Sequence, residues 1–191
     1  MDVEGCQLTP EGCQEATVLG KRFAKETSRN FLKIISSDLG RAYKTAANIN
    51  AEIGNIEHTT DERLRERAFG AFEGQSREEV DKIIGSSSMG GIDIDDGESA
   101  SDVQKRALLA IETIVNENAG KNILVVTHGG TICLLLQKFL GIGIECSCNF
   151  KIRNTSVSVI DIWPREKEKG ETGFNMHTVV QSMGDVAHLE V

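Results

Sequence analysis

Residues 121–136, KNILVVTHGGTICLLL, carry the clearest signal of fold in this chain. The run NILVV is short and mostly apolar, which is the pattern of a strand buried in a parallel sheet. The following run GTICLLLQKFLG, residues 130–141, predicts a helix packed against that sheet. His128 and Gly129 therefore lie where the strand ends and the helix begins, and the glycine lets the backbone approach a ligand closely.

Strand and helix patterns alternate along the rest of the chain, which is typical of a parallel sheet with helices on its faces. Thr9 and Pro10 mark the start of the first helix, because threonine favours the N-cap and proline the first helical position. We expect an α/β fold, a three-layer sandwich with a mostly parallel sheet flanked by helices, in one domain spanning residues 1–191. The other predicted elements are strands at 30–37, 155–163 and 174–183, helices at 38–53 and 101–119, and a short strand with an irregular loop within 56–75.

Composition and charge exclude several classes of protein. The formal net charge is −8 and the lysines and arginines form no stripe, which argues against a nucleic-acid partner. The sequence contains no apolar stretch of about 20 residues and no signal-peptide pattern, so we expect a soluble, cytoplasmic protein without a membrane partner. The five cysteines lack paired C-x-x-C spacing, and we expect reduced thiols rather than a zinc site.

Three side chains at predicted strand ends are candidates for phosphate chemistry, and each has an ordinary structural alternative. His128 is either a functional residue or a hydrogen-bonded histidine at a strand end. Arg41 lies in the first turn after a strand, where it either holds a phosphate or pairs with Asp38 on the same helix. Glu66 lies between two arginines. It is either a general acid, whose carboxyl group a nearby phosphate would keep protonated, or part of a solvated run of charges.

Six motifs carry a family resemblance: LTPEG..EA, SSDLGRAYKTA, LRERAFGAFEGQ, GES, VVTHGGTI and NTSVSVI. Their order and approximate spacing resemble the histidine phosphatase superfamily, the phosphoglycerate mutase-like proteins, over nearly the whole chain. The resemblance implies an α/β fold that hydrolyses or transfers phosphate through a phosphohistidine. By this resemblance Arg41 binds phosphate, Glu66 is the general acid, and His128 is the second histidine, which hydrogen-bonds the transferring phosphoryl group. Glu98 and Ser99 match the GES motif near the substrate pocket.

One part of the family pattern is absent from the sequence. The family begins with a strand ending in Arg-His-Gly, which supplies the nucleophilic histidine, and this sequence contains no such triplet. His58, His177 and His188 occupy other parts of the pattern and do not replace it. We therefore expect the chain to start after a missing central strand, to be a very poor phosphatase and to fold poorly alone.

Three interpretations follow from this departure. In the first interpretation, the sequence is an incomplete version of an active cytosolic phosphatase. In the second, the chain is a non-catalytic relative that binds a phosphorylated ligand or a partner protein. In the third interpretation, a strand from another chain fills the gap, as in strand-addition complexes.

The resemblance also implies a small phosphorylated metabolite as the ligand, such as phosphoserine, fructose 2,6-bisphosphate or another sugar phosphate. The short chain favours a phosphatase over a mutase, because mutases usually carry a longer insertion between the LRER and THGG motifs. Residues 85–99, rich in serine and glycine, are expected to form a lid over the site. No cofactor and no metal are implied, since the family's nucleophile is a histidine and no carboxylate cluster suits Mg²⁺. The sequence leaves open whether the chain forms a homo-oligomer.

Overall fold

The computed structural model describes residues 8–26, 29–75, 96–145, 150–165 and 174–190. Most of the expected lid lies outside these described residues. The helices are α1 (Pro10–Lys25), α2 (Gly40–Ile53), α4 (Ala100–Glu117) and α5 (Gly129–Phe139), with short 3-10 turns at Glu62–Leu64, Gly70–Phe72 and Ala187–Leu189. The strands are β1 (Phe31–Ser36), β2 (Glu57–Thr60), β3 (Asn122–Val126), β4 (Val157–Pro164) and β5 (Met176–Asp185).

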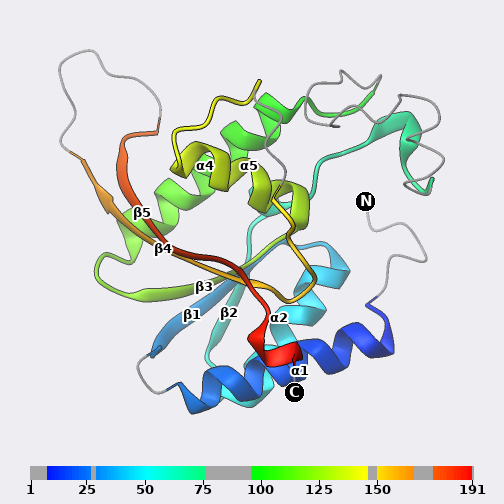
Figure 1. The fold of residues 1–191 in the computed structure, drawn as a ribbon, viewed down its shortest axis with the longest axis vertical. Coiled ribbons are helices and arrows are strands. Elements are labelled where there is room, and N and C mark those ends of the chain that lie inside the picture. Colours follow the sequence, from blue (N-terminus) through cyan, green and yellow to red (C-terminus); the bar gives the residue numbers. More distant parts are fainter. Residues whose placement is uncertain (1–7, 27–28, 76–95, 146–149, 166–173, 191) are drawn as a thin grey trace.

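The described strands form two separate groups (Figure 1). The first is a three-stranded parallel sheet in the order β2-β1-β3, in which Ser36 of β1 is in register with Thr60 of β2 and Val126 of β3. The second is the antiparallel pair β4–β5. This confirms the α/β prediction of a parallel sheet flanked by helices. The expectation of a further central strand stays a prediction.

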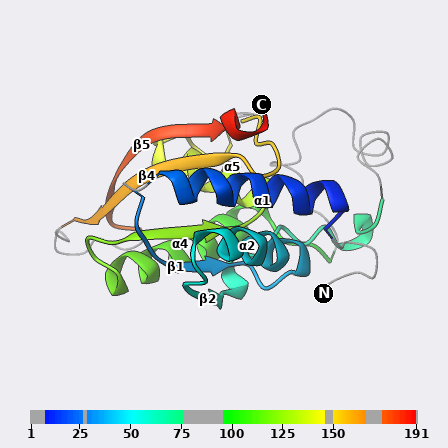
Figure 2. The same cartoon turned by 90° about the horizontal axis from the view of Figure 1, so that it is seen from below.

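Helices cover both faces of the parallel sheet. Neighbouring side chains of β3 point to opposite sides, so they pack against different helices. Leu124 packs against the cluster built by α1 and α2, whose buried members include Leu19 and Ile49. Ile123 and Val125 pack on the other side, against the cluster that α4 and α5 share with β1. Figure 2 shows the β4–β5 pair standing apart from the three-stranded sheet.

Local sequence signals explain where the main helices begin and end. The Thr9 hydroxyl accepts a hydrogen bond from the Gly12 N–H at 3.0 Å, and Pro10 occupies the first helical position, as predicted for α1. Gly54 ends α2 with a φ of 107°, a left-handed conformation that glycine adopts without strain. Within the residues that the structure describes, no helix is both long enough and apolar enough to cross a bilayer.

Candidate active site

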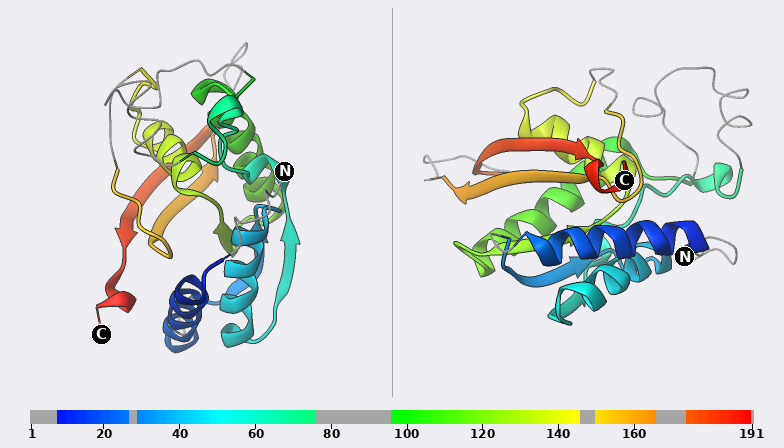
Figure 3. Two further views of the ribbon diagram at one scale, coloured as in Figure 1. Left: turned by 90° about the vertical axis from the view of Figure 1, so that its right-hand side faces the viewer. Right: turned by 60° about the horizontal axis from the view of Figure 1, so that its bottom comes forward.

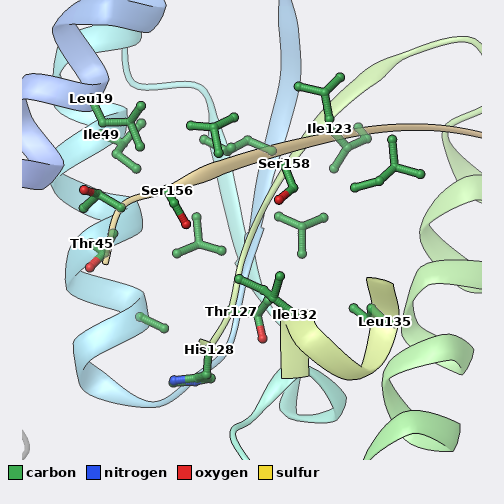
Figure 4. A pocket seen from close by; sticks show the side chains of 18 of the residues that line it. Leu19, Thr45, Ile49, Ile123, Thr127, His128, Ile132, Leu135, Ser156 and Ser158 are labelled. Carbon is green, nitrogen blue, oxygen red and sulfur yellow. The ribbon is translucent and has the colours of Figure 1, made fainter. Parts of the chain in front are cut away.

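A cavity of about 1300 Å³ lies between β3 and β4, and we call it the β3–β4 cavity. At the carboxyl end of β3 it is lined by four of the predicted residues, Arg41, Glu66, His128 and Gly129, which together form what we call the carboxyl-end site. Figure 4 shows His128 and Thr127 at this end, below the apolar side chains of the cavity. Ligands of open parallel sheets bind at this edge, because the carboxyl ends of the strands and the N-termini of the helices meet there.

The parallel register of β1 and β3 explains how His128 is held. Since Ser36 is level with Val126, the residues that follow these two strands are also neighbours. Nε2 of His128 lies 2.9 Å from Oγ of Ser37, and both side chains are buried. Ser37 Oγ also accepts a hydrogen bond from the Leu39 N–H at 3.2 Å. Sequence reasoning missed Ser37, although a hydroxyl directly after a strand adjacent to that of His128 was a usable signal.

Glu66 reaches the same helix start from the loop after β2. Its Oε2 accepts a hydrogen bond from the Gly130 N–H at 3.0 Å, and its Oε1 accepts one from the Arg67 N–H at 3.0 Å. The carboxylate therefore lies against the first turn of α5, where unpaired N–H groups favour an anion. A Cβ atom on Gly130 would lie 2.6 Å from Oε1, so this close approach requires glycine.

Side-chain hydrogen bonds to backbone carbonyls fix the loop that carries Glu66. The Thr127 hydroxyl donates to Leu64 O at 2.6 Å, and the Thr131 hydroxyl donates to Arg65 O at 2.9 Å. These bonds join the loop to the turn between β3 and α5. The two residues that directly precede Glu66 are therefore tied to the segment that carries His128.

Arg106 of α4 holds the same loop from the opposite side. Its guanidinium donates to the carbonyls of Arg63 and Arg65, both at 2.8 Å, and to that of Glu66 at 3.1 Å. Its other donors form a fork with the Glu98 carboxylate, with bonds of 2.7 and 2.8 Å. The fork lowers the pKa of Glu98 below its ordinary value.

Glu98 and Ser99 do not line the cavity with the other four predicted residues. The Glu98 carboxylate also accepts a hydrogen bond from the Ala68 N–H at 3.1 Å, which ties α4 to the loop. Ser99 is the N-cap of α4, and its hydroxyl oxygen accepts a hydrogen bond from the Asp102 N–H at 3.1 Å. The contacts shown for both residues are structural, and their role near the substrate stays a prediction.

Arg41 does not make the ion pair that was its structural alternative. The Asp38 carboxylate instead pairs with Arg65, whose Nε lies 2.8 Å from Oδ1, and this hydrogen bond is the main cause of the lowered pKa of Asp38. Across the described part of the chain, Arg41 forms no ion pair. Arg41 also lines the β3–β4 cavity, beside Glu66 and His128.

The other three histidines, all within described segments, do not line the cavity. His58 lies on β2, where Nε2 is 2.9 Å from Ser36 Oγ and the ring stacks on Tyr43. His177 stacks on a tryptophan of β4, and His188 is buried near the chain's carboxyl end. No group of three or more metal-binding side chains is present among the residues that the structure describes.

Comparison with known families adds a direct assignment. The model of the histidine phosphatase superfamily (branch 1) matches residues 2–175. This chain belongs to that superfamily. Phosphoglycerate mutase-like protein 4 of Arabidopsis thaliana is 34% identical to this superfamily member over 197 residues, which cover all of this chain and 78% of the relative. The family resemblance of the sequence motifs is therefore confirmed.

Solved structures of similar proteins agree with this histidine phosphatase fold. Bacillus stearothermophilus YhfR shares 31% identity and a TM-score of 0.77, over 95% of this chain and 86% of that one. Phosphoserine phosphatase from Entamoeba histolytica, solved as a mutant in complex with phosphoserine, shares 27% identity and a TM-score of 0.73, over 98% of this chain and 90% of that one. The superfamily member described here thus has relatives named as phosphatases and as mutase-like proteins.

Proposed function

We propose that the carboxyl-end site binds the phosphate group of a small phosphorylated metabolite and is the active site of a phosphomonoesterase. The observation that carries this proposal is the gathering of Arg41, Glu66, His128 and Gly129 around one end of the β3–β4 cavity. An arginine fork and helix N–H groups suit phosphate oxygens. The phosphoserine complex of the Entamoeba relative supports phosphoserine as a first candidate, beside fructose 2,6-bisphosphate and other sugar phosphates.

Each residue has a distinct role in the proposed reaction. Arg41 holds the phosphate oxygens, and His128, held by Ser37, hydrogen-bonds the transferring phosphoryl group. A water oxygen bonds to phosphorus as the bond between phosphorus and the ester oxygen breaks, and Glu66 in its protonated form gives a proton to the leaving alkoxide. The products are the free alcohol and inorganic phosphate, which keeps the protons of the water. The carboxyl then returns to the ionised form that the Gly130 N–H accommodates.

We also propose that these 191 residues hydrolyse a phosphate ester only slowly. Phosphohistidine chemistry needs a second histidine beside His128, and the other histidines of the chain lie away from the cavity. Positioning and electrostatic groups without a nucleophile leave only residual catalysis. Phosphate binding without efficient hydrolysis, as in a non-catalytic relative, is therefore the second candidate function. The cytoplasmic location and oligomeric state stay predictions.

Calorimetric titration with phosphoserine, together with release of inorganic phosphate from the same compound, tests both candidates. We expect saturable binding that Arg41→Ala weakens at least tenfold. Lys44→Ala is the matched control, because it removes an equal charge from the exposed face of α2 one turn away. Equal affinities of Arg41→Ala and the unaltered chain would contradict the proposed site. Rapid phosphate release by the unaltered chain would contradict the prediction of slow turnover.

A further inference from the structure

Residues 153–156, which we call the 153–156 wall, line the β3–β4 cavity just before β4 begins. They form a tight turn, in which the Ser156 N–H donates a hydrogen bond to the Arg153 carbonyl at 3.1 Å. Figure 4 shows Ser156 and His128 on the same cavity. Arg153 and Asn154 are exposed, so the wall offers a guanidinium and an amide to a ligand. The phosphate contacts proposed above use neither group.

Thr155 holds the 153–156 wall in a backbone conformation that threonine disfavours. Its φ is 54°, in the left-handed region, where a residue branched at Cβ is an outlier. Contacts from elsewhere in the chain must hold such a residue in place, and residues of this kind cluster at functional sites. The Thr155 hydroxyl donates to the Asn154 carbonyl at 2.8 Å, so its only proton is used and its oxygen can accept one.

His188 supplies the contact that holds Thr155 from outside the cavity. Nε2 of His188 lies 3.2 Å from Oγ1 of Thr155. Because the hydroxyl proton points to Asn154, Nε2 is the donor in this hydrogen bond and carries a hydrogen. His188 is only 6% exposed and does not line the cavity. It can therefore affect a ligand only through Thr155.

The 3-10 turn that carries His188 is fastened to α1. The Asp185 carboxylate accepts a hydrogen bond from the Ala187 N–H at 2.9 Å and another from Arg22 of α1 at 2.5 Å. Figure 3 shows this turn beside α1, at the carboxyl end of the chain. The position of His188 is therefore fixed by contacts that do not involve the cavity.

The surroundings of His188 favour a neutral ring. Burial lowers its pKa, and the charges of Arg22 and Arg153 lower it further, while the Asp185 carboxylate has the opposite effect. Nδ1 is buried and has no hydrogen-bond partner among the residues that the structure describes, so a second N–H there would lack an acceptor. The ring therefore carries its one proton on Nε2, facing Thr155.

We infer that His188 is a positioning residue for substrate selection, because its Nε2–H fixes Thr155 and thereby the 153–156 wall against the part of the substrate that is not phosphate. This inference rests on the proposed function, since it takes the phosphate group to lie at the carboxyl-end site. The Arg153 guanidinium suits a carboxylate or a second phosphate. The wall therefore selects phosphate esters that carry a second anionic group, and phosphoserine is one of them.

The test compares phosphoserine with inorganic phosphate by calorimetric titration of the full 191-residue chain and its variants. His188→Leu keeps a buried side chain without a donor, and we expect it to weaken phosphoserine binding at least fivefold but phosphate binding less than twofold. His188→Gln keeps an N–H donor and should restore most of the phosphoserine affinity. His177→Leu, the same change at an exposed position of β5, is the matched control and should alter neither affinity.

Two further measurements keep the inference open to refutation if His188→Leu does not fold. Arg153→Met changes an exposed side chain and should weaken phosphoserine about tenfold without weakening phosphate. Nitrogen-15 NMR of the unaltered chain at pH 7 should show His188 neutral, with its proton on Nε2. A proton on Nδ1 instead, equal losses for both probes in the variants, or no loss for phosphoserine would each overturn the inference and leave the carboxyl-end site standing. If the unaltered chain binds neither probe, the proposed function fails and this inference fails with it.

Discussion

Replacing Arg106 by methionine tests how the loop carrying Glu66 is held. The substitution keeps a long, apolar side chain on α4 but removes the fork with Glu98 and the donors to three loop carbonyls. The side chains of Arg106 and Glu98 are only 20% and 30% exposed, so water replaces these bonds incompletely. A hydrogen bond to a charged group contributes about 1.5–3 kcal/mol, and an acceptor left without its partner costs about 1–3 kcal/mol.

These contributions overlap, and we expect Arg106→Met to lower the free energy of unfolding by roughly 3 kcal/mol in total. The corresponding fall in melting temperature is about 6–12 °C for a chain of this size. Urea unfolding followed by circular dichroism measures the free energy. Lys105→Met is the matched control, since this neighbouring side chain on α4 is 72% exposed, and we expect no measurable change.

The same clamp predicts a coupling and a pH dependence. Glu98→Gln should cost less than Arg106→Met, and the double variant should be less destabilised than the sum of the two, because both changes remove one interaction. The Arg106 fork lowers the pKa of Glu98 in the folded state. The unfolded chain therefore takes up this proton first, and the stabilisation is lost as pH falls below about 4.3. A loss of less than about 1 kcal/mol in Arg106→Met would refute the clamp.

Three further predictions concern single contacts. Gly130→Ala places a methyl group 2.6 Å from Oε1 of Glu66, so the carboxylate must move, and phosphate affinity measured by calorimetry should change at least threefold; an unchanged affinity would argue against a role for this carboxylate. Burial lowers the pKa of His58, so the unfolded chain takes up this proton more readily and the folded chain loses stability as pH falls below about 6.5. His58→Asn should therefore flatten the plot of melting temperature against pH between about pH 5 and 7, and an unchanged slope would be inconsistent with that cause. Thr9→Ala should destabilise the chain by about 1 kcal/mol in urea unfolding through loss of the α1 N-cap, whereas Thr9→Ser should not.

Much of the fold could be predicted because local sequence signals and packing agree. The run NILVV became β3, and the start of α1 at Thr9 and Pro10 followed known capping preferences. The separation of β4–β5 from the parallel sheet was not visible in these patterns. Periodicity indicates which residues form a strand, whereas pairing depends on which edges are available in three dimensions.

The site was predictable in its residue types but only partly in its contacts. Arg41, Glu66 and His128 come together because parallel strands bring their carboxyl ends to one edge of the sheet. The buried bond of His128 to Ser37 and the anchoring of Glu98 by Arg106 join segments far apart in sequence. Such long-range partners have no local periodic signal, so sequence reasoning did not identify them.

A crystal structure of the chain with tungstate, a mimic of phosphate, tests whether the carboxyl-end site binds phosphate. We expect one tungstate ion in the carboxyl-end site, within hydrogen-bond distance of both the Arg41 guanidinium and the His128 imidazole. A carboxyl-end site without the anion at saturating tungstate, or an anion bound only at other residues, would show that the site does not bind phosphate.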